Sequence, residues 1–475
     1  MKNLIIIILN IFSISISAQV NYKYYQKKEL EKDLTYFSDK LMSIHPLLFD
    51  KANCSKWEHN FGAMKNSLKD SMTQNEFYLL ASPMLAFLND DHSNFICPLD
   101  QRKQYMVSGL AFPFSVSWHG NSITITEYYG SDSCMFKGGE EITQINGIAS
   151  SAIIKEMQKL VGGNSDAVRN AAIALYFRTY LWITYHFEND YEIYLKDSHN
   201  EVSKIVVKGI TNEQFQKNRM RYPQLPQERY SLVLDRINKN CILKIHSFAD
   251  LKSFCTYSDS SFQVIEEKGI ENLILDIRGN GGGRSIVVDS LMNYLTDQQY
   301  SQYKKIDTRI SNDLKSYYKE KYPEKYQDIK DSPTNELVSS AEQETIPHEK
   351  KYRFKGKLFL LTDSLTFSAA ATFAGLFKEL NLGSIIGEET GGKIEYYGDF
   401  WYLTLPNSKL QFYISPKKFI QYGGADMKKG VMPDYLIANK SDSIIKFTYS
   451  LIEKQRNTSS KFPDKLGLGA SSTGN

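Results

Sequence analysis

The chain has 475 residues, of which 42% are hydrophobic and 23% charged, a composition typical of a globular protein with roughly two to four domains. Its formal net charge of +3 is small for this length, so the composition gives no sign of a nucleic-acid partner or of a surface that attracts acidic substrates. The cysteines are odd in number and lack CxxC spacing, so we expect thiols and no metal site: they are Cys54, Cys97, Cys134, Cys241 and Cys255.

The first eighteen residues predict export. Lys2 precedes an apolar stretch from Leu4 to Ile16, and small residues follow as far as Ala18, which is the order of a secretory signal peptide cleaved before Gln19. The apolar stretch is short for a membrane span, and we predict no later transmembrane helix. We therefore expect a mature protein in a bacterial periplasm or outside the cell, with no integral membrane segment.

The next 200 residues change from a helical pattern to a strand pattern. Residues 22–90 carry apolar side chains at intervals of three and four, and Thr73 and Glu76 have the spacing of a capping box, so residues 19–100 are predicted to form a small helical subdomain. Residues 101–212 alternate as strands do, and Asn146-Gly147 predicts a hairpin turn. We expect a separate β domain there.

Residues 225–455 predict an α/β core, which makes the expected fold class α/β (an α+β multidomain chain). Apolar strands run into the glycine loop of "LILDIRGNGGG" and into the polar loop after "KLFLLT", and each loop precedes a predicted helix. Residues 300–350, rich in Tyr, Lys and Glu, are predicted as a solvated insertion. Residues 456–475 are predicted as a flexible tail.

Each of the two strand-to-helix loops has a structural and a chemical interpretation. Gly281–Gly283 can be a tight turn, or its amides can stabilise an oxyanion; the spacing GxxxxGK[ST] of a phosphate-binding loop is missing. Ser368 stands just before a predicted helix, so it can be an N-cap or a nucleophile. The GxSxG elbow of hydrolases is absent, so no general motif decides between them.

Taken together, the two loops resemble the superfamily of C-terminal processing (tail-specific) and tricorn-type serine peptidases. The resemblance is carried by "LILDIRGNGGG", "TFSAAATFAG", "SIIGEETGG" and "GVMPDY", and it covers roughly residues 25–450. It implies a crotonase-like core, a PDZ-like β domain that includes "GGEEITQING", and an N-terminal helical subdomain. It also implies that Ser368 is the nucleophile, that the amides of Gly282 and Ala369 form an oxyanion hole, and that no cofactor or metal is needed.

The resemblance offers two candidates for the general base. Lys393 lies 393 − 368 = 25 residues after Ser368, which matches the tail-specific branch, but Ala371 and Tyr397 stand where that branch has a glutamate and a glutamine. A lysine base must also lose its charge, and three neighbouring glutamates would keep Lys393 protonated.

The other candidate is His92, within "FLNDDHSNF", which matches the histidine of the tricorn branch. That branch has a glutamate near the "GVxPD" segment, where this chain has only Asp426 nearby. Because histidine needs no large pKa shift to act as a base, we expect His92 ahead of Lys393.

Two functions remain open from the sequence. The first is an exported serine peptidase that cleaves peptides or unfolded or C-terminal protein segments through an acyl-enzyme on Ser368, with the PDZ-like domain taking peptides by strand addition. The second is a degenerate family member that binds peptides without turnover. The expected partner is a peptide or unfolded protein in both cases, and the sequence does not indicate an oligomeric state.

Overall fold

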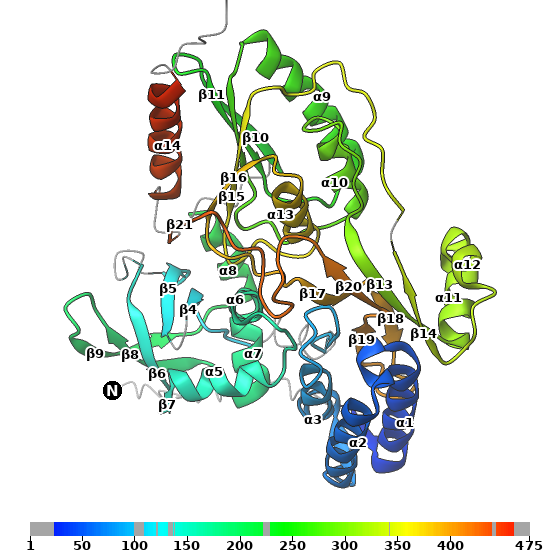
Figure 1. Ribbon diagram of the computed structural model, residues 1–475. Helices are drawn as coiled ribbons and strands as arrows, with labels where there is room; N and C mark the ends of the chain where they lie inside the picture. Colours follow the sequence, from blue (N-terminus) through cyan, green and yellow to red (C-terminus); the bar gives the residue numbers. More distant parts are fainter. Residues whose placement is uncertain are drawn as a thin grey trace, which may run out of the picture.

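The computed structural model describes residues 23–98, 109–119, 122–131, 136, 138–221, 229–341, 343–438 and 443–459. The predicted signal peptide, Cys134 and the last part of the predicted tail lie outside these residues. Figure 1 shows three regions: a helical region (residues 23–98) at the lower right, a β region (109–221) at the lower left, and a core (229–459) that extends to the top. The expected multidomain α/β fold class is confirmed.

The helical region forms where the three- and four-residue apolar spacing predicts it. The capping box is present, because the N–H of Glu76 donates to Thr73 Oγ1 at 3.2 Å and the N–H of Thr73 donates to Glu76 Oε2 at 2.8 Å. The elements are β1 (Tyr24–Gln26), α1 (Lys27–Ile44), η1 (Pro46–Phe49), α2 (Lys51–Asn66), β2 (Ser71–Thr73), α3 (Gln74–Ala86) and β3 (Asn94–Phe95).

The β region is an antiparallel sheet covered by helices. Its strands follow the order β4-β5-β6-β8-β9, so β4 is an edge strand, and β7 pairs with β6 across the predicted Asn146-Gly147 turn. Both turn residues have positive φ, 45° and 81°, as a two-residue hairpin requires. The elements are β4 (Phe114–His119), β5 (Ser122–Tyr128), β6 (Glu141–Ile145), β7 (Ile148–Ala149), α5 (Ser150–Gln158), α6 (Asp166–Leu175), α7 (Phe177–Tyr185), β8 (Asp190–Lys196), β9 (Val202–Lys208) and α8 (Asn212–Arg219).

The core is built on a six-stranded sheet of order β10-β11-β12-β15-β16-β21, in which β10 and β11 form an antiparallel hairpin and the remaining pairs are parallel. Asp276 at the end of β12 is paired with Leu361 near the end of β15, so the two candidate loops leave the same edge of the sheet side by side. The elements are β10 (Tyr230–Asp235), β11 (Asn240–Ile245), α9 (Leu251–Glu267), β12 (Asn272–Asp276), α10 (Ser285–Met292), β15 (Lys357–Thr362), α13 (Ala369–Glu379), β16 (Gly383–Gly387), β21 (Tyr435–Leu436) and α14 (Ser443–Ser459).

Residues 300–350 are not simply a solvated insertion. They contribute β13 and β14 to an antiparallel sheet of order β14-β13-β20-β17, and the ring of Tyr303 is buried against Phe419. The high content of Lys and Glu belongs to two helices at the edge of the molecule (Figure 1). The elements are β13 (Tyr303–Ile310), α11 (Asn312–Lys321), α12 (Pro323–Ile329), β14 (Glu336–Ser340), β17 (Glu395–Gly398) and β20 (Lys417–Gln421).

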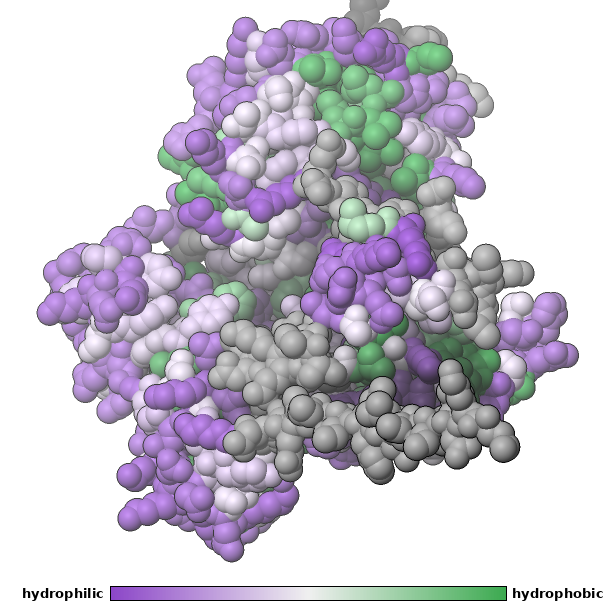
Figure 2. Space-filling model, turned by 180° about the vertical axis from the view of Figure 1, so that it is seen from behind, coloured by the Kyte–Doolittle hydropathy of each residue, from purple (hydrophilic) through white to green (hydrophobic). Residues whose placement is uncertain are grey.

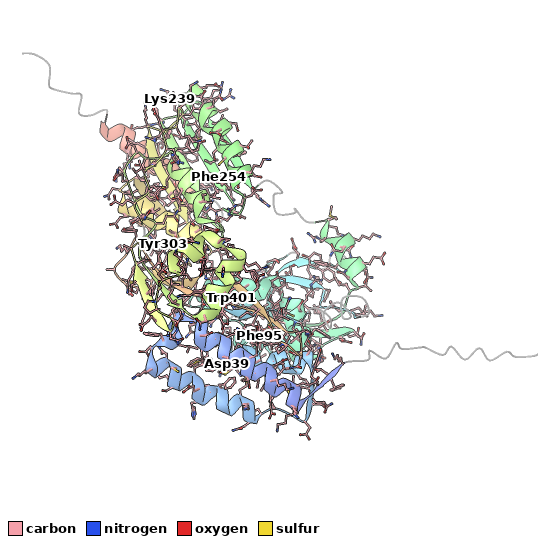
Figure 3. All side chains as sticks on the ribbon, turned by 90° about the vertical axis from the view of Figure 1, so that its right-hand side faces the viewer. Asp39, Phe95, Lys239, Phe254, Tyr303 and Trp401 are labelled. Atoms are coloured by element: carbon pink, nitrogen blue, oxygen red, sulfur yellow. The ribbon has the colours of Figure 1, made fainter. Side chains whose placement is uncertain are left out.

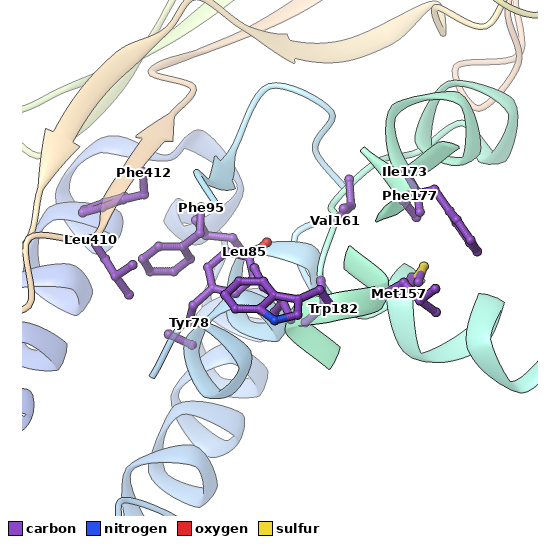
Figure 4. Packing of buried hydrophobic residues seen from close by; sticks show 14 of the residues in the cluster. Tyr78, Leu85, Phe95, Met157, Val161, Ile173, Phe177, Trp182, Leu410 and Phe412 are labelled. Atoms are coloured by element: carbon purple, nitrogen blue, oxygen red, sulfur yellow. The ribbon is translucent and has the colours of Figure 1, made fainter. Parts of the chain in front are cut away.

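A small three-stranded sheet links the helical region to the core. β18 (Trp401–Thr404) and β19 (Gln411–Ile414) form a hairpin, and β3 of the helical region pairs with β19. The same place holds a hydrophobic cluster that includes Tyr78 of α3, Trp182 of α7 and Phe412 of β19, so the regions share one core (Figure 4). The helical and β regions therefore pack as one body around the residues that follow α3.

The described surface seen in Figure 2 is mainly polar. Seen from behind, it is mostly hydrophilic, and its largest apolar area lies toward the top of the molecule, where the six-stranded sheet lies (Figure 2). None of the helices in the described ranges is long and apolar enough to cross a bilayer.

Candidate active site

Ser368 stands at the junction between the loop after β15 and helix α13, in a conformation that non-glycine residues rarely adopt. Its φ is 51° and its ψ is −128°, and its side chain makes no capping hydrogen bond to the helix. Such a conformation costs about 1–3 kcal/mol and is found where the surrounding structure imposes it, often at functional sites. The side chain is thus free of the N-cap role that the sequence allowed.

Two glycine loops close on the Ser368 backbone from opposite sides. A Cβ atom on Gly282 would lie 2.8 Å from Ser368 Cβ, and one on Gly392 would lie 3.2 Å from Ser368 N and 2.5 Å from Ala371 Cβ. Ala371 is fully buried at this contact. A side chain at position 392 would therefore meet both Ser368 and Ala371.

His92 is brought to Ser368 from the helical region, 276 residues away in sequence. Its Nε2 lies 3.4 Å from Ser368 Oγ, within hydrogen-bond reach, and its side chain is buried, with 4% of the residue exposed. The imidazole stacks on Phe367 at a centroid distance of 5.1 Å and contacts the ring of Phe400 at 5.2 Å. The structure therefore places the predicted nucleophile, Ser368, next to His92, the base that the sequence analysis preferred to Lys393.

The loop that carries His92 is held by a buried network centred on Asp90. One carboxylate oxygen accepts the N–H of His92 at 2.8 Å, and the other accepts hydrogen bonds from Ser93 Oγ and from His45 Nε2 at 3.2 Å. His45 Nδ1 accepts the N–H of Leu47, so His45 carries its proton on Nε2. Burial opposes ionisation of Asp90, but the bonds from His45 and Ser93 hold the pKa of this carboxyl below its ordinary value.

Sequence reasoning missed both Asp90 and His45, although Asp90 stands only two residues before His92. His45 lies at the end of α1, far from any motif, and no spacing in the sequence connects it to the site.

Burial is the main influence on the imidazole of His92, and it lowers its pKa. The carboxylates of Asp90 and Asp399 and the backbone of Tyr397 act in the opposite direction. Among the described residues, Nδ1 finds no hydrogen-bond partner of ordinary geometry, and none of their carboxylates binds this nitrogen directly. Asp426 is exposed and accepts the N–H of Lys428, and it does not contact the imidazole.

Lys393 is not placed at the nucleophile. Its Nζ forms an ion pair with Glu389 Oε1 at 3.4 Å, and its backbone pairs with Gly430. Within the described ranges it makes no hydrogen bond to Ser368 and it does not line the pocket that contains Ser368. Of the three neighbouring glutamates, Glu389 is the one that pairs with Lys393 among the described residues.

Three amides lie near Ser368 as candidates for an oxyanion hole. The N–H of Gly282 donates to Asn280 Oδ1 at 2.8 Å, so it is already bonded within its own loop. Gly283 and Ala369 line the pocket with Ser368, and neither N–H donates a hydrogen bond within the described part of the chain. The amides of Gly283 and Ala369 are therefore the ones available to a ligand in this pocket.

Ser368 and His92 open into a pocket of about 420 Å³. Its wall combines aromatic rings with polar groups, and its charged members are Arg284 and Asp399. Figure 3 shows Tyr303, one of the wall residues, between Phe254 of the upper core and Trp401 of the lower half of the molecule. The lining residues are His92, Gly283, Arg284, Ser285, Ile286, Tyr303, Ser368, Ala369, Tyr396, Gly398, Asp399, Phe400 and Phe419.

A second groove of about 580 Å³ lies between the edge strand β4 and helix α6. Ala167, Ala171 and Ala174 of α6 line it at helical spacing, and Val116 of β4 stands among the opposite wall residues. Leu365, three residues before Ser368, closes one end. The groove thus leads from an open sheet edge toward the nucleophile loop.

Within the described ranges no group of three or more His, Cys, Asp and Glu side chains could hold a metal ion. The described cysteines are all free thiols: they are Cys54, Cys97, Cys241 and Cys255.

Comparison with known proteins adds a family and a fold. Residues 239–437 match the model of peptidase family S41. The solved structure of mature CPAF is 14% identical, with a TM-score of 0.61 over 92% of this chain and 97% of that chain. A mutant of CPAF is 12% identical, with a TM-score of 0.63 over 90% of this chain and 96% of that chain. Mature CPAF complexed with lactacystin is 14% identical, with a TM-score of 0.60 over 92% and 98%.

At these identities the likeness to CPAF shows a shared fold. No curated protein matches the sequence.

Proposed function

We propose that this chain, which belongs to peptidase family S41 and is a serine-type peptidase, cleaves peptide bonds through an acyl-enzyme on Ser368 with His92 as the general base. The observation that carries the proposal is the 3.4 Å approach of His92 Nε2 to Ser368 Oγ in a pocket open to a substrate. A serine hydroxyl is a weak nucleophile until a neighbouring base takes its proton, and His92 is the base within reach.

In the first half of the reaction, Ser368 Oγ attacks the carbonyl carbon of the scissile bond while its proton passes to His92 Nε2. The electron pair of the carbonyl moves to oxygen, and the N–H groups of Gly283 and Ala369 stabilise the resulting oxyanion. His92 then returns the proton to the leaving amine as the C–N bond breaks. An ester on Ser368 remains, and a water that gives its proton to His92 hydrolyses it.

The buried position of His92 suits this cycle. Burial lowers the pKa of the imidazole, so the neutral form that can accept a proton predominates at neutral pH. Activity is therefore present above this pKa and is lost as the pH falls through it. The same burial makes the imidazolium costly during the reaction, so nearby carboxylates must offset part of that cost.

The groove beside β4 supports the proposal that peptides or unfolded chain ends are the substrates. An extended peptide can pair with the free edge of β4, while the small side chains of α6 leave room for its side chains. This is the peptide-binding mode expected of a PDZ-like domain. With the predicted signal peptide, the proposal places the activity in the periplasm or outside the cell.

The test is labelling by a fluorophosphonate, which reacts with activated serines. We expect intact-mass analysis to show one adduct on the mature protein and none on Ser368→Ala, while Lys393→Ala is labelled like the parent. Because mature CPAF was solved with lactacystin, protection from labelling by lactacystin is a second measurement. Labelling that survives in Ser368→Ala would overturn the assignment of the nucleophile.

The alternative is a protein that binds peptides without turnover. The observation that favours it is the missing hydrogen bond of ordinary geometry at His92 Nδ1, the position at which a serine peptidase usually orients its base. A folded protein that binds extended peptides but is neither labelled nor active would support this alternative.

A further inference from the structure

The end of β17 and the turn that joins it to β18, residues 397–400, lie beside the imidazole of the proposed base, His92. The backbone of Tyr397 interacts with the imidazole of His92, and the ring of Phe400 contacts it at 5.2 Å. Asp399 stands between them and has a positive φ of 62°, which for a residue other than glycine needs support from its surroundings. It is the one carboxylate among the described residues that line the pocket of Ser368.

Two lysines from different elements hold Asp399. Lys417 of β20 lies 3.1 Å from Asp399 Oδ2, and Lys325 of α12 lies 3.5 Å from the same oxygen. Oδ1 makes no ion pair or hydrogen bond within the described ranges. Burial opposes ionisation of Asp399, but the two lysines keep the pKa of its carboxyl below its ordinary value, so it is charged at neutral pH.

The arm formed by α11 and α12 explains why this turn keeps its place. Tyr317 of α11 stacks on Trp401 at a centroid distance of 4.5 Å, directly after the turn, while Lys325 reaches Asp399 from α12. The arm lies at the edge of the molecule (Figure 1). Its residues therefore fix the turn from outside without entering the pocket.

The charges near His92 come from two sides. Asp90 belongs to its own loop and is already bonded to His45, Ser93 and the backbone of His92. Asp399 belongs to the opposite wall, with Lys325 and Lys417 behind it, and Arg284 lines the same pocket. Of the two carboxylates, only Asp399 has an oxygen without a partner.

We propose that Asp399 is a positioning residue for the base: its carboxylate, held in place by Lys417 and by Lys325 of the α11–α12 arm, stabilises the imidazolium that His92 becomes when it accepts the proton of Ser368. The inference rests on the proposed roles of Ser368 and His92. By this proposal the α11–α12 arm supports catalysis indirectly, through Lys325 and Asp399, without touching the substrate. It also supplies the acidic partner of the histidine from the β17–β18 turn, in place of the segment before Gly430.

The direction in which each variant shifts the pKa of the His92 imidazole distinguishes the proposal from an ion pair that only holds the turn in place. If the ion pair only held the turn, loss of either partner would disturb His92 in the same direction. If the charge of Asp399 acts on His92, then Asp399→Asn lowers the pKa of the imidazole, because the lysines remain unopposed. Lys417→Met raises that pKa, because one opposing positive charge is gone.

The experiment measures the pKa of His92 by NMR of ¹³C,¹⁵N-histidine-labelled protein, with Ser368→Ala as the background so that no self-cleavage interferes. His92→Ala identifies the resonance, Lys325→Met is a second lysine variant, and Asp399→Glu tests whether the charge alone restores the parent value. Opposite shifts for Asp399→Asn and Lys417→Met, with recovery in Asp399→Glu, support the proposal. Shifts in one direction, or none in variants whose chemical-shift maps show a native fold, overturn it.

The same variants in the Ser368 enzyme give a kinetic readout on a fluorogenic peptide. The acid limb of kcat/KM should move to lower pH in Asp399→Asn and to higher pH in Lys417→Met, and the plateau of Asp399→Asn should fall about tenfold, less than the ~10²–10⁴-fold expected for loss of the base itself. Failure of the proposed function is seen separately, because His92→Ala would then keep its activity whatever the NMR result.

Discussion

The loops that carry Ser368 and His92 meet at one site but are held by different means. The nucleophile loop is fixed by backbone: glycines pack against it at Gly282 and Gly392, and Ser368 itself takes a strained conformation. The base loop is fixed by side chains from elsewhere, through Asp90 to His45 and through Ser415, whose Oγ donates to the carbonyl of His92 at 3.1 Å. A Cβ atom added at Gly282 or Gly392 should therefore disturb the nucleophile loop, whereas loss of polar side chains should disturb the base loop.

The β region touches both loops. The N–H of Gly162 donates to Asn94 Oδ1 at 2.6 Å, and the N–H of Asn164 donates to Asp91 Oδ2 at 3.1 Å. Val168 of α6 packs against Gly391, because a Cβ there would lie 2.6 Å from its Cγ2. The segment that leads into α6 therefore contacts the base loop, and α6 itself contacts the loop after β16 that packs against Ser368, close to the groove proposed for peptides.

The largest expected effect on activity comes from removing the imidazole of His92, which lies against Ser368 Oγ. His92→Ala should lower kcat/KM about 10²–10⁴-fold at pH 8, and Lys393→Ala should stay near the parent value, because its ammonium serves Glu389. The parent should lose activity as the pH falls below the ordinary histidine pKa of about 6.5, since burial lowers that of His92. Loss of activity confined to Lys393→Ala in the peptide assay would reverse the assignment of the base.

The next effect tests the backbone support of the nucleophile loop. In Gly282→Ala the new Cβ would lie 2.7 Å from Phe367 O and 2.8 Å from Ser368 Cβ, at a φ of 93°. We expect destabilisation of about 1–3 kcal/mol in urea unfolding and a large loss of labelling by fluorophosphonate. Gly281→Ala is the matched control, because nothing lies within 4 Å of its Cβ and its φ is not positive. Equal behaviour of the two variants would contradict a tight fit.

A smaller effect tests the side-chain support of the base loop. Asp90→Asn keeps the shape but removes the charge that accepts bonds from His45 and Ser93, so we expect a loss of about 1–3 kcal/mol in the free energy of unfolding. Because the folded pKa of Asp90 is lowered, its stabilisation is present above the unfolded value of about 3.9 and is lost as the pH falls through the folded pKa. The difference between parent and variant should therefore shrink in unfolding curves below about pH 4. A difference that stayed constant down to pH 2 would argue against an ionised Asp90.

The smallest effect concerns Asp91, the neighbour of the base that faces the β region. Burial raises the pKa of its carboxyl to about 7, so the folded state favours the protonated form. Its contribution to stability is full below the unfolded pKa and is lost as the pH rises through about 7. Asp91→Asn should accordingly gain stability relative to the parent between pH 5 and pH 8 with little change in kcat/KM, as thermal unfolding at both pH values can show. A relative loss over that interval would mean that Asp91 is stabilised as the anion.

The sequence by itself determined the parts of this protein that depend on neighbours in the chain. Apolar spacing and a capping box predicted α3, the Asn146-Gly147 pair predicted a hairpin, and a strand followed by glycines predicted the loop beside Ser368. Each of these patterns expresses a local constraint, such as a positive φ or a buried helix face, that is complete within a few residues. That Ser368 and the glycine loop belong to one site was predicted from the resemblance of their short motifs to those of a known peptidase superfamily.

Only the tertiary structure decided which residues from distant segments meet beside Ser368. His92 reaches Ser368 because β3 pairs with β19, and Lys325 and Lys417 hold Asp399 at the wall of the same pocket. These contacts join residues from separate parts of the chain, so no sequence pattern within one segment can predict them. Residues 303–310 show the same limit, because their strand is buried by partners that lie more than 90 residues later.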